Sequence, residues 1–157
     1  MKNMKRLPIS KVSMLATLLL GALLGLPAQA GVSCHLINAK AVGKDLGFGN
    51  TAADILGGGL LQGTVAGHIT VTGGPISGLV PFMETATFTN QHGTLTVVVT
   101  GAIDVATGQF NASGAVTGAT GKLLGATGNL SFSGMVNFVT AIFTEDVSGL
   151  VCVDLAP

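Results

Sequence analysis

Two glutamates occupy positions that the alternation of a β-strand assigns to an apolar face. Glu84 alternates with Phe82 and Phe88, and Glu145 alternates with Phe143. Burial raises the pKa of a carboxyl group because the charged form loses its hydration. Such a group can act as a general acid or base near neutral pH. If the protein is an enzyme, we expect Glu84 and Glu145 to be catalytic; the alternative is that each lies at a strand end and meets water.

Aromatic side chains on the same faces would line an apolar pocket for a small apolar molecule. The chain has no Trp and no Tyr, so its seven Phe residues are the only source of such a lining. The expected ligand-binding residues are Phe82, Phe88, Phe132, Phe138 and Phe143.

Other catalytic and metal-binding patterns are missing from the sequence. The three histidines, His35, His68 and His92, are far apart, and no HExxH or CxxC pattern occurs. We expect surface histidines, no metal site and no cofactor. Gly121-Lys122 is followed by Leu123, where a phosphate-binding P-loop carries Ser or Thr. Nucleotide binding of that kind is therefore not expected.

The first thirty residues are typical of a secretory signal peptide. Positive charges precede an apolar run at 14–26, and Ala28-Gln29-Ala30 forms a small-x-small cleavage site. We expect cleavage before Gly31, and no apolar run after it approaches membrane-spanning length. The expected product is secreted or periplasmic and makes no membrane contact.

The charge of the remaining chain excludes a nucleic-acid binder. Residues 31–157 carry three lysines and no arginine against seven acidic residues, a net charge of 3 − 7 = −4. Nucleic-acid binding needs clustered cations. We therefore expect no nucleic-acid partner.

Both cysteines fall near the ends of this region. Cys34 and Cys152 are 118 positions apart, and thiols oxidise in secreted proteins. We expect one disulfide bond, which would make the first and last strands neighbours and indicate a closed barrel. Lipid attachment at Cys34 is the less favoured alternative, because no Leu-led small triplet precedes it.

An all-β pattern extends from about residue 64 to the end of the chain. Thr, Val and Ile alternate, as in the strand expected over 94–105, and Gly, Asn and Asp clusters mark turns at 90–93, 104–108 and 118–128. Residues 31–63 are less regular, because glycines break the period. Here we expect one strand followed by a long loop, with a short helix around 51–56 left open.

Several segments resemble dirigent proteins and allene oxide cyclases, which share an eight-stranded barrel. Residues 116–128 resemble the family's "VVGGTGxFRxARG" strand-turn-strand, and Thr87–Asn90 with Gly93–Leu95 resembles its "vFxxGxGSTLxVxG" hairpin. Phe143–Val153 resembles the closing strand. The resemblance implies a cup with an apolar lumen that holds a reactive or apolar small molecule, and a trimeric assembly.

The resemblance has one important departure. The positions that match the motif's two arginines carry Leu124 and Thr127. The similarity therefore supports the fold more than an activity.

The sequence thus predicts a signal peptide over 1–30 and one antiparallel β-barrel of about eight strands over 31–157. The expected function is binding of a small apolar molecule in the lumen, with cyclase, isomerase or dirigent-like activity left open. The alternative is a non-catalytic structural or surface-interaction barrel.

Overall fold

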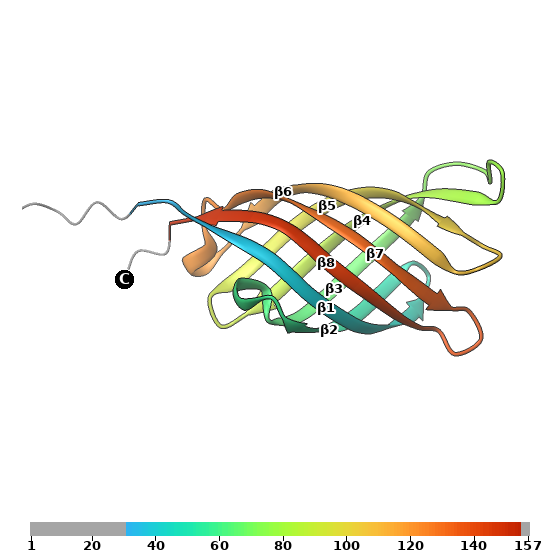
Figure 1. Ribbon diagram of the computed structural model, residues 1–157, viewed down its shortest axis with the longest axis horizontal. Coiled ribbons are helices and arrows are strands. Elements are labelled where there is room, and N and C mark those ends of the chain that lie inside the picture. Colours follow the sequence, from blue (N-terminus) through green and yellow to red (C-terminus); the bar gives the residue numbers. More distant parts are fainter. Residues whose placement is uncertain (1–30, 155–157) are drawn as a thin grey trace, which may run out of the picture.

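A computed structural model describes residues 31–154, which form a closed barrel of eight antiparallel strands (Figure 1). The strands follow one another round the barrel in chain order. Within the described residues, no helix is long and apolar enough to cross a membrane. The strands are β1 (Ser33–Gly47), β2 (Asn50–Gly57), β3 (Gly63–Val71), β4 (Leu79–Asn90), β5 (Gly93–Asp104), β6 (Gln109–Ala119), β7 (Thr127–Asn137) and β8 (Ile142–Val153). The expected signal peptide, residues 1–30, lies outside the described region.

The first and last strands close the barrel. β1 pairs with β8 from Ser33 opposite Val153 to Lys44 opposite Ile142. Cys34 faces Cys152 directly in this register, and the two form the expected disulfide bond. Because such bonds persist in oxidising surroundings, this bond points to an extracellular or periplasmic location.

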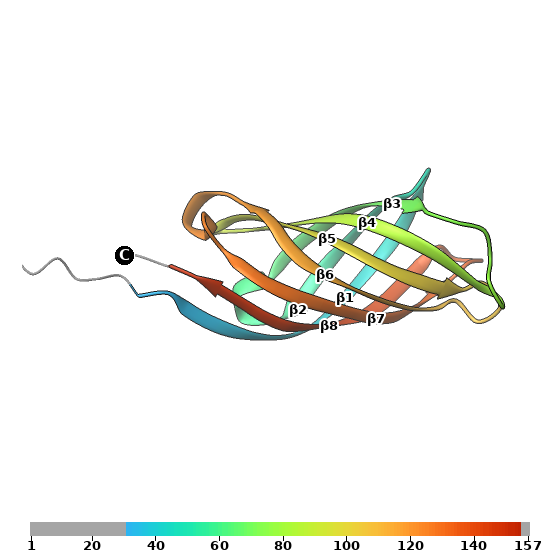
Figure 2. The same ribbon diagram turned by 90° about the horizontal axis from the view of Figure 1, so that it is seen from above.

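The two ends of the barrel differ, and both views show it (Figure 2). One end carries the described termini and two short 3-10 helices, η1 (Gly59–Leu61) and η2 (Gly121–Leu123). Leu61 and Leu123 from these helices are fully buried and cap that end of the core. The other end, called the mouth below, is formed by the turns that join β1–β2, β3–β4, β5–β6 and β7–β8.

Alternate residues of every strand face inward, and small side chains are common among them. β1 contributes Ile37, Ala39 and Ala41, and β5 contributes Leu95, Val97 and Val99. An eight-stranded barrel has an interior just wide enough to be filled by side chains. These residues therefore form the core along the barrel axis.

The prediction for residues 31–63 was right about a first strand and wrong about the long loop after it. Two strands, β1 and β2, occupy most of it, and 51–56, where a helix was left open, belongs to β2. A tight turn at Phe48 and Gly49 joins them, and both residues have positive φ. The glycines that break the sequence pattern here thus make a hairpin turn and do not mark a long loop.

The other predicted turns are confirmed. Residues 91–92 join β4 to β5, and the chain reverses again between Asp104 and Gln109. The repeated Gly-Ala-Thr-Gly segments flank η2, where Gly121 and Gly125 have positive φ. The register of β5 against β6 also shifts after the pair of Thr96 and Gly118, which is a β-bulge.

Candidate functional site

Glu84 points into the lumen from β4. It lies between Phe82 and Phe88 on the inward face, and both of these rings are buried. The Thr51 hydroxyl on β2 donates a hydrogen bond to Glu84 Oε1 at 3.1 Å. Burial raises the pKa of Glu84, while the bond from Thr51 acts in the opposite direction. The glutamate is therefore both held in place and shifted toward its protonated form.

A glycine on the intervening strand leaves room for this contact. Gly67 lies on β3, opposite Thr51 of β2. A Cβ atom at position 67 would overlap the Glu84 carboxyl group and the Thr51 hydroxyl. The Glu84 side chain can therefore reach across β3 to β2 only because residue 67 has no side chain.

Glu145 enters the lumen from β8, on the opposite wall of the barrel from β4. Burial, followed by the negative charge of Glu84, raises the pKa of Glu145 to about 7. Its neighbours on the flanking strands are small, Ala41 on β1 and Gly134 on β7. At neutral pH both protonation states of Glu145 are therefore populated, as general acid or base catalysis requires.

No lysine of the described region compensates these two carboxyl groups. Lys40, Lys44 and Lys122 are all exposed to solvent, and Lys40 forms an ion pair at 2.7 Å with the outward-facing Asp146. The lumen thus carries two acidic side chains with no lysine beside them. Burial raises the pKa of both groups, and at Glu145 the negative charge of Glu84 adds to the effect.

The two glutamates lie between a filled half of the lumen and a less densely buried half. On the capped side many inward residues are fully buried, such as Leu95, Leu130 and Val151, whereas Val116 and Ala119 are only partly buried. Toward the mouth, four apolar residues that pack on the core are only partly buried: Ile69, Ile103, Phe110 and Phe143. We call these four the collar.

The five expected lining residues do not all reach the lumen. Phe82, Phe88 and Phe132 are buried, and the rings of Phe88 and Phe132 lie 6.3 Å apart. Phe143 belongs to the collar. Phe138 is 59% exposed, because β7 ends at Asn137 and Phe138 lies in the following turn. The expectation that Phe138 shares the inward face of β7 was therefore wrong.

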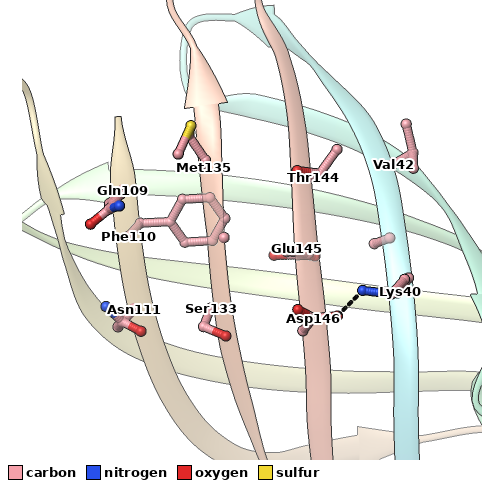
Figure 3. A pocket seen from close by; sticks show the side chains of 12 residues that line it. Lys40, Val42, Gln109, Phe110, Asn111, Ser133, Met135, Thr144, Glu145 and Asp146 are labelled. Carbon is pink, nitrogen blue, oxygen red and sulfur yellow. Dashed lines mark hydrogen bonds and ion pairs between the residues drawn. The ribbon is translucent and has the colours of Figure 1, made fainter. Parts of the chain in front are cut away.

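Three hollows lie on the outer wall of the barrel. The largest two have volumes of about 520 and 540 Å3. Figure 3 shows the first, over β6, β7, β8 and β1, where outward side chains such as Asn111, Ser133 and Asp146 surround it and Lys40 pairs with Asp146. Phe110 and Glu145, whose side chains lie on the inward faces of β6 and β8, also line this hollow.

Histidine placement agrees only in part with expectation. His68 is exposed, but His35 alternates with the inward residues of β1 and is half-buried. Its Nε2 atom is buried and has no hydrogen-bond partner within residues 31–154. Among those residues, no group of three or more His, Cys, Asp or Glu side chains is arranged to hold a metal ion.

Comparison with known proteins gives no relative. No protein-family model, no curated protein and no solved structure matches the chain. The eight-stranded antiparallel barrel is thus shown by the structure itself, and the resemblance to dirigent proteins and allene oxide cyclases has no support from a family match.

Two residues of the site were missed from the sequence. Thr51 was placed in a loop or short helix, so its inward position on β2 was hidden. Gly67 lies within the alternating pattern of β3, and an inward glycine between apolar residues was the available signal. The catalytic and ligand-binding roles of the predicted residues stay predictions.

Proposed function

We propose that the protein binds a small, mainly apolar molecule in the mouth-side half of the lumen, in contact with Glu84 and Glu145. The observation that carries the proposal is the pair of carboxyl groups turned into the lumen from opposite walls. Glu84 and Glu145 are half-buried. A carboxyl group that loses hydration without gaining a charged partner costs stability, and a barrel that served only as a support would be more stable with apolar residues here. Shifted pKa values of this kind are concentrated at functional sites.

The collar supports the mouth-side half as the place of binding. Its four side chains are partly buried, whereas Leu95, Leu130 and Val151 in the capped half are fully buried. A protonated carboxyl group donates a hydrogen bond and an ionised one accepts. A suitable ligand is therefore an apolar molecule with one or two polar groups, such as a hydroxyl or a carbonyl.

The resemblance to dirigent and allene oxide cyclase barrels adds two finer proposals. The first is cyclase, isomerase or dirigent-like activity, in which Glu84 and Glu145 act as acid and base. The second is assembly of three copies, which sedimentation of the purified protein tests directly.

Retention of a ligand is the direct test. The exported protein is purified, extracted with organic solvent and analysed by mass spectrometry beside the Glu84→Gln/Glu145→Gln double variant. We expect the native protein to retain a compound, or to bind the uncharged probe N-phenyl-1-naphthylamine, and the double variant to bind about tenfold less. The matched control is Asp146→Asn, which alters the outward-facing residue next to Glu145.

Two results would contradict the proposal. One is that the native protein neither retains a compound nor binds the probe. The other is that the double variant, folded by circular dichroism, binds as well as the native protein.

A purely structural barrel is the second proposal, and one observation favours it. The capped half of the lumen is filled by side chains, with Leu61 and Leu123 fully buried at its end. An inert barrel predicts no retained compound and no effect of the two glutamate substitutions on binding.

A further inference from the structure

Exposed apolar side chains gather on the turns at the mouth. Each of the four turns or its flanking residues contributes at least one, and Phe48 and Val139 are 100% and 95% exposed. We call this set the crown: Leu46, Phe48, Val71, Ile76, Leu79, Val105, Phe138, Val139 and Ile142. In Figure 1 these turns lie together at the end opposite the described termini.

Folding does not explain why Phe48 stands in its turn. Its side chain buries nothing within the described chain, and its backbone has φ 55°, a left-handed conformation that favours glycine or asparagine. All three non-glycine residues with positive φ in residues 31–154 lie in mouth turns: Phe48, Ser77 and Ala141. The hairpin turns require this backbone conformation but not an exposed phenylalanine, and a strained residue that the fold does not require is a sign of function.

From the crown we infer a second property, independent of ligand binding in the lumen and contrary to the expectation of no membrane contact: the mouth inserts into the surface of a bilayer of zwitterionic lipid. Side chains on separate turns around a ring can each enter a fluid hydrocarbon phase. A protein partner would instead need one continuous complementary patch. Apolar groups at an interface of this kind reach the boundary between headgroups and acyl chains.

Charge decides which lipid fits. The carboxylates of Asp45 and Asp104 at the mouth accept hydrogen bonds from turn amides, those of Gly47 and Ala106. Among the lysines of the described region, Lys44 on β1 is nearest to the mouth, so one lysine stands there beside these two carboxylates. With a net charge of −4 over 31–157, the protein is repelled by anionic headgroups. Attraction must therefore come from apolar burial, so it should be insensitive to salt and not strengthened by anionic lipid.

The opposite end provides a matched control. Leu124 follows η2 and is 73% exposed, and the β4–β5 turn beside it carries Gln91 and His92. Other exposed apolar residues at this end, such as Leu36 and Leu56, lie on the strands. A substitution at Leu124 therefore removes a largely exposed apolar side chain from the opposite end.

Vesicle flotation tests the inference. The exported protein is mixed with phosphatidylcholine vesicles at low and high salt, beside Phe48→Asn/Val139→Ser and Leu124→Ser variants with the same N-terminus. Asparagine tolerates the left-handed turn, so the double variant should keep its fold and melting temperature. We expect the native protein to float, its partitioning to fall about tenfold or more in the double variant, and Leu124→Ser to behave as native.

Several outcomes would overturn it. These are no flotation of the native protein, flotation that requires phosphatidylglycerol, or an equal loss in Leu124→Ser. A further contradicting outcome comes from sedimentation without vesicles. If the native protein is an oligomer and the double variant is a monomer, the crown is a contact between copies of the chain. None of these outcomes bears on the lumen, because both glutamates are intact in every variant.

Discussion

Glu84 and Glu145 enter the lumen from β4 and β8, which are opposite walls of the closed sheet, and the charge of Glu84 helps to raise the pKa of Glu145. The two carboxyl groups therefore act as one site even though they are distant in the sequence. Burial, together with the charge of Glu84, also makes stability depend on pH.

The free energy of unfolding should fall as pH rises. Glu145 has a pKa of about 7 in the folded chain against an ordinary value of 4.5, so between these values the folded state binds more protons than the unfolded state. Stability is therefore full below the ordinary pKa and is lost as pH rises through the folded one. We expect the free energy of unfolding to fall by roughly 3 kcal/mol, and urea unfolding at a series of pH values measures this loss.

The Glu145→Gln variant should lose most of this pH dependence, because the amide does not ionise. The remaining slope comes from Glu84, whose pKa is also raised. Asp146→Asn is the control and should keep the native slope, since Asp146 is exposed on the outer wall. A native protein with flat stability over this range would refute the prediction.

Gly67→Ala should destabilise the barrel by roughly 1–2 kcal/mol, because the new Cβ displaces the Glu84 carboxyl group from Thr51. The cost should shrink when Glu84→Ala is present as well, which a double-mutant cycle measures. Gly74→Ala, where a Cβ meets nothing within 4 Å, is the control and should be near neutral. Equal costs with and without Glu84 would disprove the contact.

Leu123→Ala should cost about 2–5 kcal/mol, because this side chain is fully buried at the capped end. The neighbouring Leu124 is 73% exposed, so Leu124→Ala should change stability by less than about 0.5 kcal/mol. Thermal and urea unfolding of both variants measure the difference. Similar effects of the two substitutions would show that η2 does not cap the core.

Loss of the disulfide bond should lower the free energy of unfolding by about 2–5 kcal/mol, since its loop spans most of the described chain. The Cys34→Ser/Cys152→Ser variant should still form the barrel below its lowered melting temperature, because β1 and β8 pair along their full length. Unchanged stability, or a chain that is unfolded at low temperature, would each contradict this expectation.

Much of the barrel could be predicted because, in its later strands, the alternation of apolar and polar residues and the residue types of the turns indicate the same strand boundaries. The β4–β5 hairpin follows from a polar turn between two alternating segments, and the inward position of Glu84 follows from its place between Phe82 and Phe88. The cysteine positions predicted closure, which the β1–β8 pairing confirms.

The first hairpin could not be predicted because its inward face is made of small residues. In β1 the inward Ala39 and Ala41 are no more apolar than the outward Leu36 and Val42, so the alternation is hidden. Phe48 is fully exposed in the turn, although an aromatic residue normally indicates a strand or the core.

The predicted inward position of Phe138 was wrong for a local reason. The side-chain oxygen of Asn137 accepts hydrogen bonds from the amides of Val139 and Thr140, which ends β7 one residue earlier than alternation suggested. The site depends on Thr51 and Gly67 as well, and only the register of β2 against β3 shows that they meet.

Titration of the Glu145 carboxyl group, followed by carbon-13 NMR in the native protein and in Glu84→Gln, tests the lumen site most directly. The expected result is a midpoint near pH 7 in the native protein, and a lower one once the charge of Glu84 is removed. A midpoint at the ordinary value of 4.5 in both proteins would mean that Glu145 meets water, and would contradict the site.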